Sequence, residues 1–172
     1  EGDNSNTMAG LGWAADVKIM ALKFMQLNDE GETTGSMYNA TRAIRYAAAH
    51  GAHIINASWG IYSYSQALDD AVNYAREKGV LFVCSAGNKT QDNDSYAHYP
   101  SNLKTDNLIS VAALGTSSAL ASFSNYGHYS VDLCAPGTGL RSTTLAGGYT
   151  NSCSGTSFAA PCVSAIAALL LA

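Results

Sequence analysis

A serine near the end of the chain stands where a nucleophile for acyl transfer would be placed. The residues there are Gly155-Thr156-Ser157-Phe158-Ala159-Ala160-Pro161, and the apolar stretch 162–172 follows them. This pattern predicts a helix that begins at the serine, and the free N–H groups of a helix N-terminus stabilise negative charge that develops nearby. Ser157 is therefore a candidate nucleophile, and its own N–H is a candidate oxyanion donor. An ordinary N-cap serine is the alternative.

An asparagine that follows a predicted buried strand is the second candidate for chemistry. Asn88 comes directly after Ser85-Ala86-Gly87, at the end of the apolar run 80–85. A side-chain amide in that position can donate to a carbonyl oxygen as it becomes an oxyanion. The alternative is a turn residue, because Gly-Asn is a common turn pair. Thr156 is expected either to support the oxyanion site through its hydroxyl or only to pack.

The elements that must position these residues alternate along the chain. Hydrophobic periodicity predicts helices at Ser36–His50 and Ser65–Lys78. It predicts strands at Val17–Phe24, Ala52–Ser58, Val80–Ser85 and Leu108–Ala113. Alternation of this kind indicates an α/β fold with a mostly parallel sheet flanked by helices. Functional sites in such sheets lie at the carboxyl ends of the strands, which is where Ser58, Asn88 and the loop before Tyr99 are expected.

Composition limits the classes of partner. The chain has 172 residues, of which 47% are hydrophobic and 13% are charged, enough to bury a substantial core. Its net charge of −4 and the absence of a basic cluster argue against nucleic acid or an anionic membrane as a partner. Its apolar runs are too short to span a bilayer.

The four cysteines lack the spacing of a metal site. They are widely separated, with no Cys-x-x-Cys pair and no interleaved histidine. Cys84, Cys134 and Cys162 are predicted to be small core residues, and Cys153 to lie near the mouth of the site. The disulfide state is left open.

Four blocks of the chain resemble, in order, the motifs of subtilisin-like serine proteases (subtilases, peptidase S8). They are Asn56-Ala57-Ser58-Trp59-Gly60, Ser85-Ala86-Gly87-Asn88, Tyr99-Pro100-Ser101 and Gly155–Pro161, and the likeness extends from about Asp3 to Ala172. The resemblance implies a three-layer fold. It also implies a serine endopeptidase that hydrolyses peptide bonds through an acyl-enzyme on Ser157, with Asn88 as a catalytic oxyanion donor.

The family's catalytic Asp and His motifs are missing from these residues. No Asp-Ser-Gly, Asp-Thr-Gly or His-Gly-Thr occurs, and none of the four His has the surroundings of a catalytic base. The expectation is therefore a single partial domain over residues 1–172, cut at both ends and lacking the N-terminal segment with Asp and His. Such a fragment should be nearly inactive alone, should pair with the missing part of its domain, and should self-associate through its uncovered core surface.

Two other functions fit parts of the pattern. One is a pseudoprotease, a peptide-binding or structural module whose upstream half has lost Asp and His. The other is a different α/β hydrolase, which the absence of any Gly-x-Ser-x-Gly motif disfavours.

The resemblance also assigns residues to a peptide or protein substrate. It implies that the substrate backbone pairs with two edges, Ser58-Trp59-Gly60 and Thr34-Gly35-Ser36. One wall of the pocket for the P1 side chain, which precedes the cleaved bond, would be Ser85, Ala86 and Gly87. His98 falls at the floor of that pocket, where a bulky titratable group would narrow it or favour polar or acidic side chains.

A calcium site and an extracytoplasmic location follow from the resemblance alone. The polar loop 3–8 resembles the family's calcium loop, with Asn4 supplying a side-chain oxygen and Asn6 and Met8 supplying carbonyls. An ordinary Asx-rich turn is the alternative.

Overall fold

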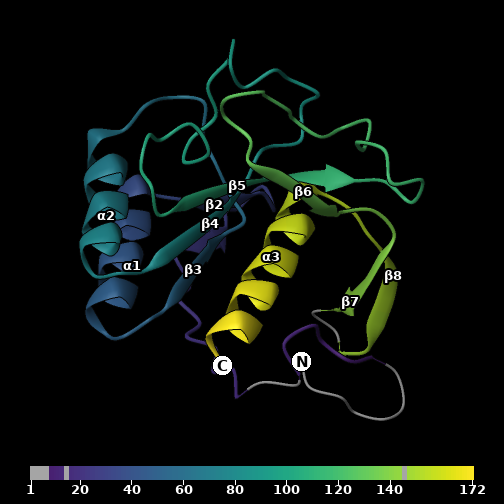
Figure 1. Cartoon of the computed structure of the whole chain (residues 1–172), viewed down its shortest axis with the longest axis horizontal. Coiled ribbons are helices and arrows are strands. Elements are labelled where there is room, and N and C mark those ends of the chain that lie inside the picture. The colour runs from purple at the N-terminus through teal and green to yellow at the C-terminus, as the bar shows by residue number, and fades with distance from the viewer. Residues whose placement is uncertain (1–7, 14–15, 145–146) are drawn as a thin grey trace.

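The computed structural model describes residues 8–13, 16–144 and 147–172, and its centre is a four-stranded parallel sheet. The strands are β3 (Ile54–Ala57), β4 (Leu81–Ser85), β5 (Leu108–Leu114) and β6 (Leu133–Pro136), paired in that order (Figure 1). Because every pair is parallel, each connection must cross over from one end of the sheet to the other. All four strands therefore end at the same edge.

Helices cover both faces of the sheet. On one face α1 (Met37–Ala49) and α2 (Gln66–Glu77) pack against each other, and on the other lies α3 (Thr156–Leu171) (Figure 1). Neighbouring residues of β4 face opposite layers: Phe82 belongs to the core cluster of α1 and α2, and Val83 to that of α3. The predicted three-layer α/β fold is confirmed.

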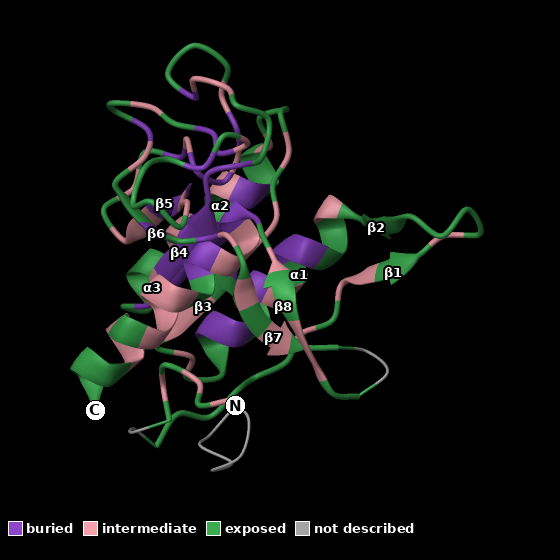
Figure 2. Cartoon of the chain, turned by 90° about the vertical axis from the view of Figure 1, so that its right-hand side faces the viewer, coloured by how far each residue is buried: buried purple, intermediate pink, exposed green. Residues whose placement is uncertain are grey.

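Local sequence signals account for the ends of α1 and α2. Ser36 and Ser65 are the N-caps, and their hydroxyls accept hydrogen bonds from the N–H groups of Asn39 (3.2 Å) and Leu68 (3.4 Å). The predicted helices at 36–50 and 65–78 are thus correct to within one residue at each end. Their inward-facing side chains are buried, and the buried residues gather on the sheet and the helix sides that face it (Figure 2).

Two antiparallel hairpins were not predicted. They are formed by β1 (Met25–Leu27) with β2 (Thr33–Gly35), and by β7 (Leu140–Thr143) with β8 (Tyr149–Cys153). The predicted strand at 17–24 is wrong. Its apolar side chains, including Ile19 at 84% exposure, have no neighbouring strand among the described residues, and a strand needs a partner for its backbone groups.

The cysteines also differ from expectation. Cys84 is fully buried on β4, and desolvation raises the pKa of its thiol. Cys134, predicted to be buried, is exposed on β6, and Cys162 is only partly buried, with its Sγ 3.3 Å from the Phe158 carbonyl oxygen. All four thiols are free.

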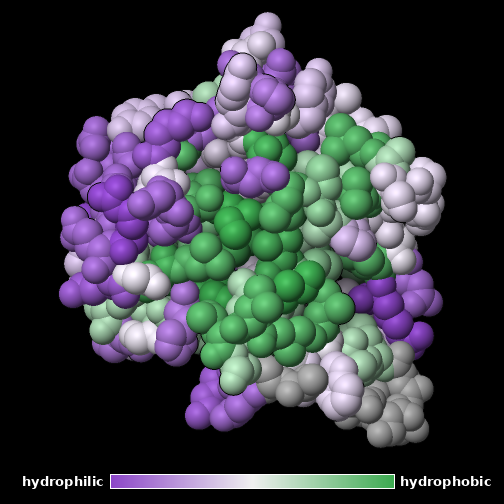
Figure 3. Space-filling view, viewed as in Figure 1, coloured by the Kyte–Doolittle hydropathy of each residue, from purple (hydrophilic) through white to green (hydrophobic). Residues whose placement is uncertain are grey.

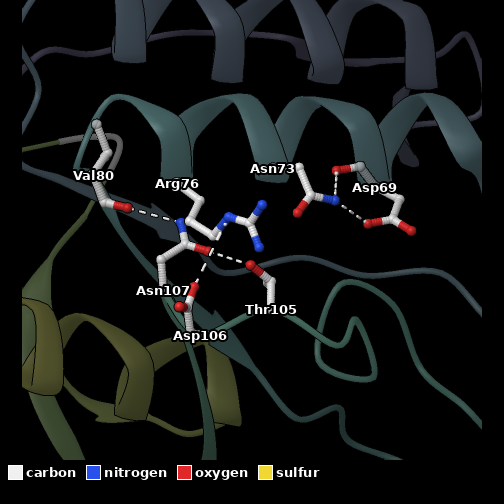
Figure 4. A network of polar contacts seen from close by, with 7 residues as sticks. All are labelled: Asp69, Asn73, Arg76, Val80, Thr105, Asp106 and Asn107. Atoms are coloured by element: carbon white, nitrogen blue, oxygen red, sulfur yellow. Dashed lines mark hydrogen bonds and ion pairs between the residues drawn. The ribbon is translucent and has the colours of Figure 1, made fainter.

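Polar side chains join the start of β5 to the chain around α2 and β4 (Figure 4). Asn107 donates from Nδ2 to the carbonyl of Val80 (2.8 Å) and accepts from the Thr105 hydroxyl (2.7 Å). Beside Asn107, Nε of Arg76 on α2 lies 3.9 Å from Oδ1 of Asp106. Asn107 satisfies the carbonyl that directly precedes β4, so it helps to set the register of β4 against β5.

An apolar area lies on the face of the molecule that carries α3 (Figure 3). The last part of this helix exposes large side chains, with Ile166 at 52%, Leu170 at 83% and Leu171 at 64%. None of the helices in the described part of the chain is both long and apolar enough to cross a membrane.

Asp94 anchors the loop that leads into β6. Its carboxylate accepts hydrogen bonds from the Ser130 hydroxyl (2.6 Å) and from the N–H groups of His128 (2.7 Å) and Tyr129 (3.1 Å). The Ser130 bond has the largest effect on the carboxyl group, desolvation opposes it, and the backbone bonds add to it. The net result is a lowered pKa for Asp94, because these donors stabilise its charged form.

Replacing Asp94 by asparagine should therefore destabilise the fold in a pH-dependent way. The folded-state pKa lies below the unfolded value, so the stabilisation is complete above the unfolded pKa, about 4, and is lost as the pH falls through the folded pKa. Urea unfolding should show a lower midpoint for D94N at pH 7, and the gap from the parent protein should narrow towards pH 3. Asp106, which forms an exposed ion pair with Arg76, provides the control. D106N should change the urea midpoint little at either pH. An equal gap for D94N at both pH values would contradict this role.

Candidate active site

Ser157 lies at the N-terminus of α3, one residue inside the helix. The N-cap is Gly155, which has φ 145° and no side chain, so the alternative of an N-cap role for Ser157 is wrong. The hydroxyl of Ser157 donates to the carbonyl of Ser58 (3.0 Å), and the hydroxyl of Ser58 donates back to the carbonyl of Ser157 (2.8 Å). The candidate nucleophile is thus held against the segment that follows β3.

Asn88 is fixed from its oxygen side. Its Oδ1 accepts hydrogen bonds from the backbone N–H and from the hydroxyl of Thr156, both at 2.9 Å. Thr156 is fully buried, and its hydroxyl oxygen accepts from the N–H of Gly87 (3.2 Å). Because two donors hold Oδ1, the Nδ2 group of Asn88 is directed away from Thr156.

Two unpaired donors meet above Gly155. A Cβ atom placed on Gly155 would lie 3.6 Å from Nδ2 of Asn88 and 3.7 Å from the backbone nitrogen of Ser157. Neither donor has a hydrogen-bond partner among the described residues. Two N–H groups around one open point beside a serine hydroxyl form the arrangement that binds an oxyanion. The glycine leaves that point free, and the Cδ2 atom of the Phe158 ring lies 3.7 Å from it.

A chain of side chains ties Ser58 to the middle of α3. Ser164 donates from its hydroxyl to Oδ1 of Asn56 (3.0 Å), and Nδ2 of Asn56 donates to the Ser58 hydroxyl (2.9 Å). From the sequence, Asn56 was named only as part of the block 56–60, and Ser164 was not identified. The polar Asn56 on an otherwise apolar strand was the only signal that pointed to them.

The two predicted substrate edges meet around Phe24. Gly35 ends β2, and a Cβ on it would lie 3.0 Å from the Phe24 ring. The other side of the contact is Trp59, whose ring centroid is 5.2 Å from that of Phe24. Thr34, Gly35 and Ser36 also line a hollow of about 530 Å³ together with residues 23–26 and Asn39.

His98 lies between Gly60 and the segment Ser85-Ala86-Gly87. A Cβ on Gly60 would overlap the imidazole ring, and a Cβ on Gly87 would lie 3.4 Å from its Cδ2 atom. His98 is 5% exposed, and burial lowers its pKa to about 4. The ring is therefore neutral at pH 7, which removes the basis for expecting acidic side chains in the pocket, because no positive charge is present.

The sequence analysis also did not identify two buried asparagines, Asn93 and Asn125, that lie behind the segment 85–87. Asn93 donates to the carbonyl of Ala86 (2.8 Å) and accepts from Nδ2 of Asn125 (2.9 Å), and both side chains are fully buried. Oδ1 of Asn125 accepts from the N–H of Lys89 (2.7 Å), next to Asn88. These buried hydrogen bonds fix the backbone of Ala86 and Lys89, on either side of Asn88. In sequence, a buried Asn cannot be told from the turn Asn that is common in loops.

Neither a general base nor a calcium site is assembled in the described part of the chain. Ser157 has no hydrogen bond to any of the four His side chains, all of which are described. Of the predicted calcium ligands, Asn4 and Asn6 lie outside the described residues and only Met8 is within them. No group of three or more His, Cys, Asp or Glu that could hold a metal ion occurs in the described ranges.

Comparison with known proteins places this site in context. The chain is 38% identical to the thermophilic serine proteinase of Bacillus sp. (strain AK1) over 170 residues. The aligned part covers 99% of this chain and 39% of that relative. It is 34% identical to Subtilisin Savinase of Lederbergia lenta, covering 96% of the chain and 58% of the relative. The chain thus spans less than two thirds of the length of these relatives.

A solved structure and a family match agree with these likenesses. A cold adapted subtilisin-like serine proteinase superposes with a TM-score of 0.73 at 34% identity, covering 84% of this chain and 50% of the other. All residues from 1 to 172 match the sequence profile of the Subtilase family. With its Ser157 and Asn88 converging at a helix N-terminus, the chain belongs to the subtilase family.

Proposed function

We propose that this chain supplies the nucleophile and the oxyanion hole of a serine endopeptidase. The observation that carries the proposal is the pair of free donors, Nδ2 of Asn88 and N–H of Ser157, on either side of the open point above Gly155. A peptide carbonyl oxygen in that position gains both hydrogen bonds as it becomes negative. The Ser157 hydroxyl on the same helix turn is then the group that attacks.

The reaction proceeds through an ester. A substrate strand pairs with the edges at Ser58-Trp59-Gly60 and Thr34-Gly35-Ser36, which places its carbonyl beside Ser157. Oγ of Ser157 bonds to the carbonyl carbon while its proton passes to a general base, which returns the proton to the amine as the C–N bond breaks. Water then attacks the ester and regenerates the hydroxyl.

The proposal places the general base and its orienting carboxylate outside these 172 residues. Its support is that, in the described part of the chain, no His side chain bonds Ser157, while the apolar area on α3 leaves Ile166, Leu170 and Leu171 uncovered. An upstream part of the same domain would cover this area and bring in the base. Without that part, the chain would retain only the residual catalysis of its oxyanion hole, and it would self-associate through α3.

The calcium site at Asn4, Asn6 and Met8 and the extracytoplasmic location stay predictions of the resemblance. Neither enters the reaction above. The pseudoprotease alternative shares the peptide-binding edges with the enzyme and differs only in the activation of Ser157.

Covalent labelling separates the enzyme from the pseudoprotease. The chain, produced together with its upstream segment, is treated with a fluorophosphonate, and adducts are located by mass spectrometry. An activated serine should carry the adduct on Ser157, because only a deprotonating base makes its hydroxyl reactive. The S154A variant, altered three residues away, should label equally. Binding of peptides without any adduct on Ser157 would establish the pseudoprotease instead.

A further inference from the structure

The imidazole of His98 lies between Gly60, on one proposed substrate edge, and Gly87, in the segment that the resemblance assigns to a wall of the P1 pocket. Its Cε1–Nε2 side lies against Gly60, and its Cδ2 atom lies towards Gly87. Tyr62 covers the ring from outside, with centroids 5.1 Å apart in an edge-to-face contact. Because Nε2 is bonded to both Cε1 and Cδ2, this nitrogen is the ring atom that faces the gap between the two glycines.

The hydrogen bonds of Ser101 determine which ring nitrogen carries the proton. The Ser101 hydroxyl has a single hydrogen, which it donates to the carbonyl of His98 (2.5 Å). Its oxygen also lies 3.2 Å from Nδ1 of His98. Since the hydroxyl hydrogen is already used, Nδ1 must be the donor in the second contact. A neutral ring with a proton on Nδ1 has none on Nε2, which then presents a lone pair.

The Nε2 atom is left without a partner. No described residue donates a hydrogen bond to it. In the described part of the chain, the polar side-chain atoms that are both sealed from solvent and unpaired are Gln91 Oε1 and Ser110 Oγ. Nε2 is not one of them, so it keeps access to solvent although the residue as a whole is only 5% exposed. An unpaired acceptor of this kind is favourably completed by a donor from a ligand.

We propose that His98 makes the P1 pocket short and ends it in a hydrogen-bond acceptor, so that the protease prefers substrates with serine before the cleaved bond. The ring occupies the depth that a large P1 side chain would need between Gly60 and Gly87. A serine side chain is small and can donate its hydroxyl proton to Nε2. An alanine side chain is equally small but cannot form this bond. This inference rests on the proposed endopeptidase function.

Two substitutions of His98 separate size from hydrogen bonding. Three peptides that differ only at P1, with Ser, Ala or Phe, are compared by kcat/KM for the chain produced with its upstream segment. The parent protein should cleave after Ser about three- to tenfold better than after Ala, the effect of one neutral hydrogen bond, and should cleave poorly after Phe. H98F keeps the bulk and should lose the preference for Ser over Ala. H98G should lose that preference and also accept Phe.

The same three peptides are used for the control variant and for the results that would contradict the proposal. The exposed His53 lies outside the site, so H53F should leave the three values in their original order. Equal cleavage after Ser and Ala by the parent protein would overturn the proposal. So would an unchanged ratio of the two values in H98F, because the acceptor would then have no effect.

The tautomer can be measured without any catalysis. Long-range 1H–15N spectra of the parent protein at pH 7 should show His98 with a protonated Nδ1 and an unprotonated Nε2. S101A, which removes the partner of Nδ1, should shift the ring towards the other tautomer. A protonated Nε2 in the parent protein would overturn the inference even if Ser157 labels normally. Absence of labelling at Ser157 with the expected tautomer would instead refute the proposed function.

Discussion

Replacing Ser157 by alanine should lower kcat for peptide hydrolysis by about a millionfold, the scale observed when the nucleophile of a subtilisin is removed. The change deletes the atom that forms the acyl-enzyme. The oxyanion donors at Asn88 and at the backbone of residue 157 remain, as do the substrate edges. KM should therefore change little, because binding of the ground state does not need the hydroxyl. Steady-state hydrolysis of a peptide by the chain with its upstream segment gives both constants.

Ser154 provides a matched serine for this experiment. Its hydroxyl oxygen accepts a hydrogen bond from the N–H of Gly139 (3.1 Å) and lies outside the oxyanion site, so S154A should keep kcat within a few-fold of the parent value. A kcat for S157A within tenfold of the parent protein would show that another group is the nucleophile. The hydroxyl of Ser58, which contacts Ser157 directly, would then be the first to test.

Replacing Asn88 by alanine should lower kcat by about 100- to 1000-fold, the cost measured in a subtilisin for the loss of one oxyanion donor. Nδ2 of Asn88 gains its full hydrogen bond only when the substrate oxygen becomes negative, so the loss falls on the transition state. KM should stay within about threefold of the parent value. The same steady-state assay separates the two constants.

A substitution of Thr156 should lower kcat by a smaller amount than the loss of Asn88. Thr156→Val removes the hydroxyl bond to Oδ1 of Asn88 and leaves the backbone N–H bond in place. The amide should then be less firmly directed, and kcat should fall by about tenfold, less than in N88A. A rise in KM with an unchanged kcat in N88A would mean that the amide only binds substrate. A larger loss in the Thr156 variant than in N88A would mean that Thr156 also acts on catalysis by a route other than Asn88, such as its hydrogen bond from the N–H of Gly87.

The parts of the fold that depend on neighbours in the sequence could be predicted. Ser36 and Ser65 cap α1 and α2 through hydrogen bonds that span three residues, so the sequence itself carries the signal. The apolar spacing of α2 and the run at β4 likewise predicted what is buried. The same reasoning failed at 17–24, because an apolar run forms a strand only where another strand pairs with it.

The candidate site likewise contains some features that could be predicted from the sequence and others that could not. Ser157 and Asn88 could be proposed as candidates because Ser157 lies in the first turn of α3 and Asn88 lies three residues after β4, and both elements are visible as apolar runs in the sequence. The protonation of His98 was not, since it depends on the hydroxyl of Ser101 and on burial beneath Tyr62. Asn93 and Asn125 gave no signal at all, because they pair across 32 residues and their burial depends on the packed fold.

The sequence by itself determined the alternation of helices and strands and the edge of the sheet at which the polar residues gather, and it supplied the candidates for the nucleophile and the amide. These follow from local periodicity and from the rule that parallel strands end together. Only the tertiary structure decided that Oδ1 of Asn88 is bound and its Nδ2 is free, that Gly155 leaves the point beside both donors open, and that His98 is buried between Gly60 and Gly87. Each of these depends on directions of hydrogen bonds between segments far apart in the chain, and residue spacing carries no information about such directions.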